Sequence, residues 1–334
     1  MPARRAVALQ RERHAAEQIP YAAHVAESVV RTLSGDYLQA FRLGGASFES
    51  ADDEQLNNWH ERLNVLWRNV ASPDLALWTH VIRRRERATL RPAAHAPGFA
   101  AALATRYVTR LGGETLMVNE LYLAVLFRPA AGLAAELVAG VLARTRRRHR
   151  PMELNQALES CAKLAQTVQA SLARYDPEPL GVYRCGNAWC STLLEYLALL
   201  VNGEPRRVPL PRGPLNEALA TTRLLFGTEA IEYRMPAATR VGAMLGIKEY
   251  PTPSVVGMFN RLLSAPFALV LTHSFTFLTK ASGQALLQRQ FYRMANAGDF
   301  ALVRTLGFLS HLDRLLAPCA GVVYWAGGDA RREP

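Results

Sequence analysis

The 334-residue sequence has only three lysines, and it contains no Gly-Lys dipeptide. The phosphate loop of nucleotide-driven motors, G-x-x-x-x-G-K-[ST], needs glycines so that backbone N–H groups can surround phosphates, and a lysine that reaches the terminal ones. The nearest skeleton runs from Gly181 to Gly186, but Asn187 and Ala188 follow where the lysine and the Ser or Thr are needed. The sequence therefore excludes this kind of nucleotide site and predicts a strand end and a turn there.

Other catalytic and structural signatures are missing as well. Neither a G-x-S-x-G elbow nor an H-E-x-x-H pair occurs. Cysteine is scarce, and the four residues are Cys161, Cys185, Cys190 and Cys319. A zinc site needs four ligands at close spacings, and no second His or Cys pair stands near Cys185 and Cys190. The cysteines are therefore predicted to be reduced thiols of a cytosolic protein.

Long uninterrupted hydrophobic runs are also absent. The most apolar stretch, residues 117–143, is interrupted by Glu120, Arg128, Pro129 and Glu136, so it is not expected to span a bilayer. Residues 1–18 form a basic N-terminal extension that is alanine-rich and lacks the apolar centre of a secretory signal. Any attachment to a membrane is therefore predicted to be peripheral.

Positive charge is abundant: 39 Lys and Arg residues face 28 Asp and Glu residues, for a net charge of +11. Two groups of arginines stand out in the sequence, namely Arg144, Arg146, Arg147, Arg148 and Arg150, and Arg83, Arg84, Arg85 and Arg87. Either group could contact phosphates of DNA or of lipid headgroups. Aromatic residues for base stacking are missing beside the first group, which favours a solvated loop.

The eight histidines are scattered along the chain. His273 lies between two hydroxyl residues and could act as a base that activates one of them. No carboxylate neighbour is visible, however, and a hydrogen-bonded histidine in a sheet is the expected state of His273, His80 and His24. Lys248 and Glu249 are adjacent in a predicted strand, so they point to opposite faces. No catalytic, cofactor-binding or metal-binding residue is therefore assigned.

Half of the residues are hydrophobic, which is typical of a folded protein, and the length suggests two lobes. We predict an α+β fold with two lobes of mixed sheet and packed helices, and no RecA-like motor domain. The first lobe covers residues 19–129. Its predicted elements are a hairpin at 29–43, a helix that begins near Ser50 and Asp53, a central strand at Leu75–Arg83, a helix at Phe99–Leu111 and a strand at Met117–Phe127.

A connector and a long helix from Leu154 to Leu172 are predicted at 130–176, and the second lobe at 177–300. Its predicted elements are a strand at Leu180–Arg184, a helix at Ser191–Asn202, strands at Glu229–Met235 and Thr239–Tyr250, a helix at Ser254–Leu263 and a strand at Phe267–Thr279. This order is that of a ferredoxin-like, split-βαβ unit. Residues 301–334 have no sustained helical or strand period, so they are expected to be an atypical tail, truncated or out of frame.

A series of short motifs spread over residues 19–300 resembles a known family. The motifs are Ile19-Pro20-Tyr21 with His24-Val25, Trp78-Thr79-His80-Val81 with Arg83-Arg84, Asn119-Glu120-Leu121-Tyr122-Leu123, Leu194-Glu195, Phe226-Gly227 with Glu229, Ile247-Lys248-Glu249-Tyr250-Pro251, Leu271-Thr272-His273-Ser274-Phe275, and Gln288 with Gln290. Their order is similar to that in the VirB/TrbE/CagE family, the largest ATPases of type IV secretion and conjugal transfer. The match fails after about Asp299.

The resemblance implies a cytoplasmic protein, peripheral at the inner membrane, that contacts inner-membrane components of a secretion system and self-associates with like subunits. ATP and Mg belong to a carboxy-terminal RecA-like motor domain in the full-length family, and no cofactor is expected in this chain. The chain is thus expected to be the amino-terminal docking part of such an ATPase, truncated and unable to hydrolyse ATP. The alternatives are a stand-alone basic nucleic-acid-binding protein that uses the arginine groups, and a hydrolase that uses His273.

Overall fold

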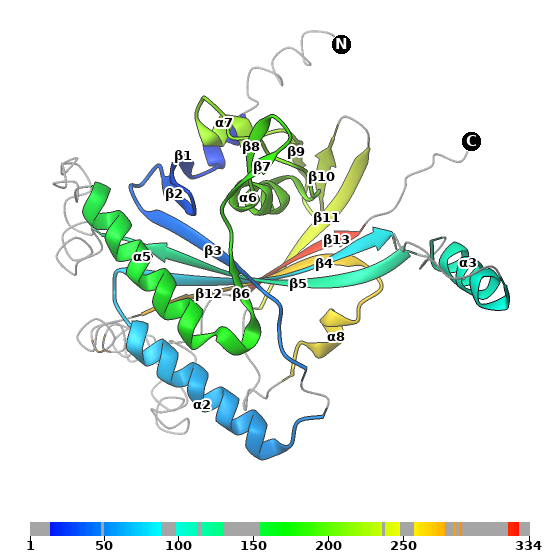
Figure 1. Cartoon of the computed structure of the whole chain (residues 1–334). Helices are drawn as coiled ribbons and strands as arrows, with labels where there is room; N and C mark the ends of the chain where they lie inside the picture. The colour runs from blue at the N-terminus through cyan, green and yellow to red at the C-terminus, as the bar shows by residue number, and fades with distance from the viewer. Residues whose placement is uncertain are drawn as a thin grey trace, which may run out of the picture.

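The computed structural model describes residues 14–47, 50–87, 98–112, 115–129, 154–235, 238–247, 257–277, 284, 288 and 320–326, and its centre is one large sheet (Figure 1). Eleven strands of the described part join this sheet, with ten in the order β1-β2-β3-β5-β4-β12-β13-β11-β10-β9 and β6 paired to β3. Each strand pair in the described part of this sheet is antiparallel, so the predicted mixture of strand directions is wrong.

The strands of this sheet are β1 (Tyr21–Ala26), β2 (Val29–Thr32), β3 (Tyr37–Leu43), β4 (Leu75–Arg87), β5 (Thr115–Phe127), β6 (Pro177–Pro179), β9 (Arg223–Phe226), β10 (Ile231–Arg234), β11 (Thr239–Gly246), β12 (Ala268–Thr276) and β13 (Ala320–Ala326). A separate hairpin consists of β7 (Val182–Cys185) and β8 (Ala188–Ser191). The α-helices are α2 (Asp53–Val70), α3 (Phe99–Gly112), α5 (Leu154–Ser171), α6 (Thr192–Asn202), α7 (Leu215–Leu219) and α8 (Asn260–Leu263). Two short 3-10 helices are η1 (Ala15–Gln18) and η2 (Ala173–Tyr175).

Helices cover both faces of the sheet. Successive side chains of a strand point to opposite faces, so apolar residues on either face are buried by the helices of that side. On one face, α2 and α5 bury Leu66 and Val168 against Leu123 of β5. On the other face, α6 packs against Tyr122 and its sheet neighbours, and α7 lies beside it. The described core is therefore a sheet between two helical layers, as Figure 1 shows with α6 and α7 on one side and α2 and α5 on the other.

Strands from both predicted lobes lie side by side in this sheet. β12 pairs with β4 in a register that runs from Leu269 opposite Arg83 to Thr276 opposite Ala76. The central position predicted for the strand from Leu75 is confirmed, since β5 and β12 flank β4. The division into two lobes and the ferredoxin-like order of the second stay predictions. Among the described strands, β7 pairs with β8 alone, outside the main sheet.

One strand lies within the segment predicted to be an atypical tail. Residues 320–326 form β13, which pairs with β12 on one side and β11 on the other. The segment Ala-Gly-Val-Val-Tyr-Trp-Ala has no alternation of polar and apolar residues. A search for polar and apolar residues that alternate with period two misses a strand of this composition. The predicted truncation or frame change stays untested.

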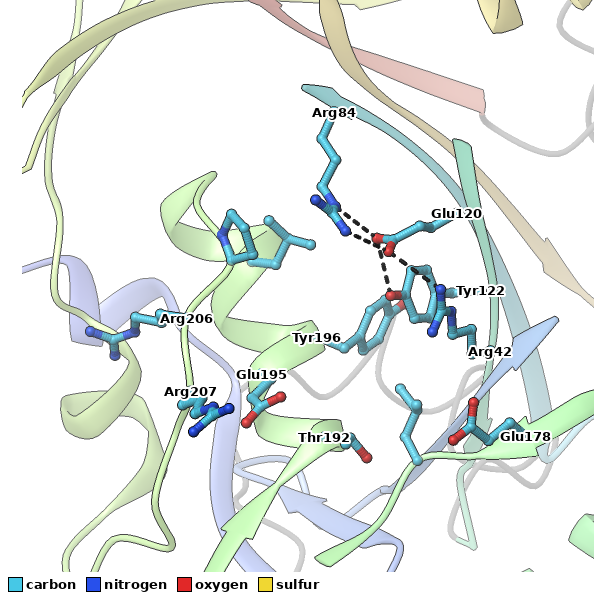
Figure 2. A pocket seen from close by; sticks show the side chains of 13 residues that line it. Arg42, Arg84, Glu120, Tyr122, Glu178, Thr192, Glu195, Tyr196, Arg206 and Arg207 are labelled. Carbon is cyan, nitrogen blue, oxygen red and sulfur yellow. Dashed lines mark hydrogen bonds and ion pairs between the residues drawn. The ribbon is translucent and has the colours of Figure 1, made fainter. Parts of the chain in front are cut away.

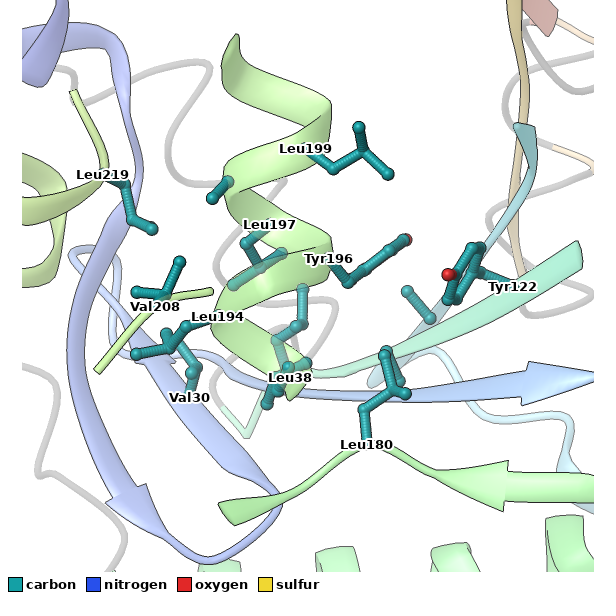
Figure 3. Close-up of a cluster of buried hydrophobic side chains, with 14 of the residues drawn as sticks. Val30, Leu38, Tyr122, Leu180, Leu194, Tyr196, Leu197, Leu199, Val208 and Leu219 are labelled. Carbon is teal, nitrogen blue, oxygen red and sulfur yellow. The ribbon is translucent and has the colours of Figure 1, made fainter. Parts of the chain in front are cut away.

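Helix α6 is the best-specified element of the chain, and its predicted range is confirmed. The Ser191 hydroxyl accepts the Leu194 N–H at 3.3 Å at the N-terminus, and Gly203 ends the helix with a φ of 73°. That left-handed conformation suits glycine, which has no Cβ to clash. Between these caps, Leu193, Leu194 and Leu197 are fully buried in a larger hydrophobic cluster, and Figure 3 shows Leu194 and Leu197 within it.

Smaller differences concern starts and ends of elements. The cap of α2 is Asp52, whose carboxylate accepts the Gln55 N–H at 2.7 Å, rather than Ser50. Strand β1 was not predicted, and the predicted strand at 180–184 is confirmed in β7 with a small shift. Helix α8 covers the last part of the helix predicted at 254–263, and residues 251–256 lie outside the described part.

No helix among the described residues has the length and apolarity needed to cross a bilayer.

Candidate functional site

A pocket of about 400 Å³ lies between α6 and the sheet (Figure 2). Its walls come from β3, β4, β5, β6, α6 and the segment that follows α6. The pocket has polar and apolar surface in similar amounts, and its charged residues are Arg42, Arg84, Arg206 and Arg207 together with Glu120, Glu178 and Glu195. Because these residues come from positions up to 165 apart along the chain (42 and 207), only the tertiary fold brings them together.

Glu120 of β5 holds one side of the pocket together. Its carboxylate accepts two hydrogen bonds from Arg84 of β4, at 2.9 and 3.2 Å, and lies 3.6 Å from an Arg42 nitrogen. The Tyr122 hydroxyl donates to the same carboxylate at 3.3 Å. The hydrogen bond to Glu120 raises the pKa of Arg84, while burial and then the Glu120 charge raise the pKa of Tyr122 to about 12. Both groups therefore keep their protons, and the network is fixed at neutral pH.

Glu120 is the residue on which this network depends, and its replacement by alanine is expected to lower the free energy of unfolding by about 2 kcal/mol. The Glu120 side chain is only 11% exposed and that of Arg84 24%, so Arg84 would stay largely buried with only Glu86 as a carboxylate partner, at 3.1 Å. Urea unfolding of the purified chain measures the change. The control is Glu232→Ala, since the Glu232–Arg234 pair is more exposed and should contribute much less. Equal losses for the two variants would contradict the assignment.

Aromatic side chains form the wall behind this network. The Tyr196 ring of α6 stacks on Tyr122 with centroids 4.7 Å apart and meets His80 edge-on at 5.7 Å. The Tyr196 hydroxyl and the His80 Nδ1 atom are 2.6 Å apart. Burial lowers the pKa of His80 to about 4 and raises that of Tyr196. His80 is thus a neutral, hydrogen-bonded histidine in a sheet, as predicted.

The opposite side of the pocket is organised around Glu195 of α6. Its Oε1 atom accepts the Tyr183 hydroxyl at 2.6 Å and the Val208 N–H at 3.4 Å, and the hydrogen bond from Tyr183 raises the pKa of that tyrosine. The nearby Arg207 donates to the Cys185 Sγ atom at 3.3 Å, and Arg206 to the Ala218 carbonyl at 3.4 Å. The Arg206 Nε atom is buried without a hydrogen-bond partner. Within the described residues, neither Arg206 nor Arg207 pairs with a carboxylate.

The structure describes most of one of the two arginine groups noted in the sequence and none of the other. Arg83 donates to the Ala265 carbonyl at 2.6 Å and to the Asn119 side chain at 2.9 Å, and Arg84 is held by Glu120. Since neighbouring strand residues point to opposite faces, these two arginines cannot grip one phosphate together. Arg85 is exposed, and the Arg87 side chain and the group at 144–150 lie outside the described residues.

The other sequence-predicted positions do not converge on a catalytic site. His24 Nε2 lies 3.0 Å from the Ser191 hydroxyl, which confirms a hydrogen-bonded histidine. His273 is half-buried in β12 opposite Thr79, burial lowers its pKa, and no described carboxylate is bonded to it. The Gly181 to Gly186 skeleton forms β7 and the turn into β8, as predicted, with Gly186 at a φ of 61°. Lys248 and Glu249 lie outside the described residues.

Sequence reasoning missed the pocket because none of its parts is a local motif. The one usable signal was that side chains alternate between the two faces along the long strands β4 and β5. Glu120 stands two residues from Tyr122, and Arg84 stands four residues from His80, whose rings both face α6, and charges of opposite sign on neighbouring strands form cross-strand pairs. The family motifs at Trp78–Arg84 and Asn119–Leu123 contain these residues, but the pairing of the two segments was not predicted.

Comparison with known proteins gives two family matches in the same order as the predicted lobes. Residues 28–134 match the model for "Type IV secretion system ATPase VirB4/TrbE, N-terminal domain". Residues 178–313 match that for "CagE, TrbE, VirB family, component of type IV transporter system". The second match extends beyond Asp299, so the predicted end of the resemblance is too early.

Three curated relatives show the extent of the similarity. The type IV secretion system protein virB4 of Bartonella henselae is 33% identical over 295 residues, which cover 88% of this chain and 37% of the relative. The virB4 protein of Brucella melitensis is 34% identical over 300 residues (87% and 36%). The protein PtlC of Bordetella pertussis is 34% identical over 303 residues (87% and 35%). The chain thus spans little more than a third of the length of these relatives.

Proposed function

The chain belongs to the VirB4/TrbE family of type IV secretion system ATPases, and we propose that its own part in such a machine is assembly. In this proposal it is the amino-terminal docking part of the ATPase. It binds inner-membrane components of the secretion system, associates with like subunits, and lies on the cytoplasmic side, peripheral to the inner membrane. The match of residues 28–134 to the N-terminal domain of the family carries this proposal.

ATP and Mg²⁺ are the cofactors that an ATPase family implies, and the residues of this chain do not fit them. No lysine follows a glycine anywhere in the sequence, and the one glycine skeleton of suitable length forms a β-hairpin rather than a loop before a helix. Among the described residues, no three His, Cys, Asp or Glu side chains are placed to hold a metal ion. We therefore assign no hydrolytic step to these residues.

The pocket under α6 is the proposed contact site for a protein partner. Arg206 and Arg207 line it without a carboxylate partner in the described structure, while Glu120 and Glu195 are already engaged in hydrogen bonds. An acidic segment of a secretion component would complement these two cations. A weak contact of Arg144, Arg146, Arg147, Arg148 and Arg150 with anionic lipid or DNA is part of the same proposal.

Copurification of the chain with the inner-membrane proteins of a type IV secretion system tests the docking role. We expect the chain to remain bound to the inner-membrane proteins after detergent extraction. The double variant Arg206→Glu with Arg207→Glu should reduce the amount of chain recovered with them by roughly tenfold or more. The control is Arg31→Glu, an exposed arginine of β2 that does not line the pocket. No copurification would refute docking itself, and equal recovery of both variants would remove the pocket from it.

The catalytic part of the proposal has a separate test. We expect the purified chain not to turn over ATP. If the chain turns over ATP and a point change within the described residues abolishes this turnover, the chain hydrolyses ATP by some other arrangement. The proposal would then be wrong.

Nucleic-acid binding is the second candidate, and the basic composition favours it. It predicts affinity for DNA that falls steeply as salt rises, in the absence of any secretion protein. Two contacts within the chain weaken this candidate. Arg83 donates to the Ala265 carbonyl and Arg84 to Glu120, so these cations are not free to bind phosphates of DNA.

A further inference from the structure

Helix α3 carries its largest apolar side chains on its outer surface. Phe99, Leu103 and Tyr107 are four residues apart, so they share one face, and they are 83%, 56% and 61% exposed. No residue of α3 is buried, and its half-buried positions include the smaller Ala104 and Val108. Figure 1 shows α3 at the far end of β4 and β5, away from the helices that cover the sheet. An amphipathic helix placed in this way has an apolar face without a partner in the described structure.

The charge around this helix is mostly positive. Between positions 83 and 114 the sequence contains seven arginines and two acidic residues, Glu86 and Glu114. Arg106 and Arg110 of α3 are exposed and lie three residues beyond Leu103 and Tyr107, so they border the apolar face. The helix itself has no acidic residue. An apolar face bordered by cations alone complements a surface that is apolar inside and anionic at its rim.

We infer that α3 is an interfacial helix that lies flat on an anionic lipid surface. Phe99 and Leu103 would enter the boundary between headgroups and acyl chains, the Tyr107 hydroxyl would stay at the headgroup level, and Arg106 and Arg110 would contact lipid phosphates. Fourteen residues are too few to span a bilayer but are enough to lie in its surface. The inference rests on the proposed peripheral location and names the element that produces it.

A second copy of the chain is a less suitable occupant of this face. In a two-fold contact the same patch meets itself, so Arg106 and Arg110 would approach their own copies without an acidic residue on α3 to separate them. Like charges in such a contact cost free energy, whereas lipid phosphates neutralise them. The charge pattern therefore favours lipid over self-association through α3.

Cosedimentation with lipid vesicles tests the inference on the full chain. We expect binding to vesicles of equimolar phosphatidylcholine and phosphatidylglycerol, and little binding to phosphatidylcholine alone. The double variant Phe99→Ser with Leu103→Ser should weaken the binding at least tenfold or so, because it removes most of the buried apolar area. Replacing Arg106 and Arg110 by glutamine should weaken it by roughly tenfold, with a reduced dependence on salt.

The matched control is Phe226→Ser, which removes an aromatic ring of β9 that is 74% exposed but far from α3 in the sheet order. It should bind like the unchanged chain, and circular dichroism should show that all variants are folded. Absence of binding to anionic vesicles would overturn the inference. So would unchanged binding by the Phe99 and Leu103 variant, or a dimer that depends on these residues while vesicles stay unbound. Because the vesicles contain no secretion protein, this test can fail while the docking proposal survives.

Discussion

Replacement of Leu197 by alanine is expected to lower the free energy of unfolding by about 4 kcal/mol. Leu197 is 1% exposed and lies in the middle of α6, between the sheet and the α7 region (Figure 3). Truncation removes apolar burial and leaves a cavity, because the helix is fixed at both ends by Ser191 and Gly203 and cannot move inward to fill it. This loss would remove a large share of the stability of an ordinary domain.

Chemical denaturation of the two proteins measures the loss. Leu103→Ala makes the matched control, since Leu103 is also a leucine in a helix but is 56% exposed, and its truncation should change the unfolding free energy by no more than about 0.5 kcal/mol. A Leu197 variant as stable as this control would show that α6 does not form the described core. The same control also shows whether changes on α3 leave the fold intact, as the vesicle experiment requires.

Acidification from about pH 6.5 to pH 4 should destabilise the protein, and His80 should account for about 3 kcal/mol of that loss. Burial lowers the folded-state pKa of His80 to about 4, below the 6.5 of an unfolded chain. In this window the unfolded state binds a proton at this residue and the folded state does not, so stability decreases as pH falls. Above pH 6.5 the contribution is fully present, and below pH 4 it is lost.

His80→Gln is the variant that separates this effect from the rest of acid unfolding. Glutamine can still accept the Tyr196 hydroxyl but has no proton to bind, so the decrease of stability between pH 6.5 and pH 4 should become shallower. His24 and His273 also have lowered pKa values, and they remain as a background of the same sign in both proteins. The control is His60→Gln, an exposed histidine of α2. An identical pH dependence for His80→Gln and the unchanged protein would show that His80 is not held neutral by burial.

Much of the local structure was predictable because its signals are local. The helix that became α6 was specified by Ser191 at its start, Gly203 at its end and the leucines between them. The hairpin at 29–43 and the strand at Leu75 were found from turn residues and runs of apolar side chains. The predicted start of α2 near Ser50 and Asp53 agrees with the helix, which begins at Asp53, but its cap is Asp52, since Ser50 and Asp52 are both suitable caps and only the backbone path selects one of them.

The pocket could not be predicted in the same way. Arg84 was read as one of a row of cations, yet its charge is paired with Glu120 on the neighbouring strand and its role is to fix a wall of the pocket. His80 looked like any histidine of a strand until α6 placed Tyr196 against it. The exposed face of α3 was equally hidden, because a periodic row of Phe99, Leu103 and Tyr107 predicts an amphipathic helix without telling whether its apolar face is covered.

The sequence by itself determined that this chain has no phosphate-binding lysine on a glycine loop, and it determined the family motifs and most of the helices and strands, since each of these is written in neighbouring residues. Only the tertiary structure decided that β12 joins β4, that β13 enters the sheet, and that Arg206 and Arg207 line a pocket with Glu120 and Glu195. The physical reason is that strand pairing and charge pairing depend on which distant segments are packed together, and hydrophobic burial of both sheet faces selects that arrangement without leaving a periodic mark in the sequence.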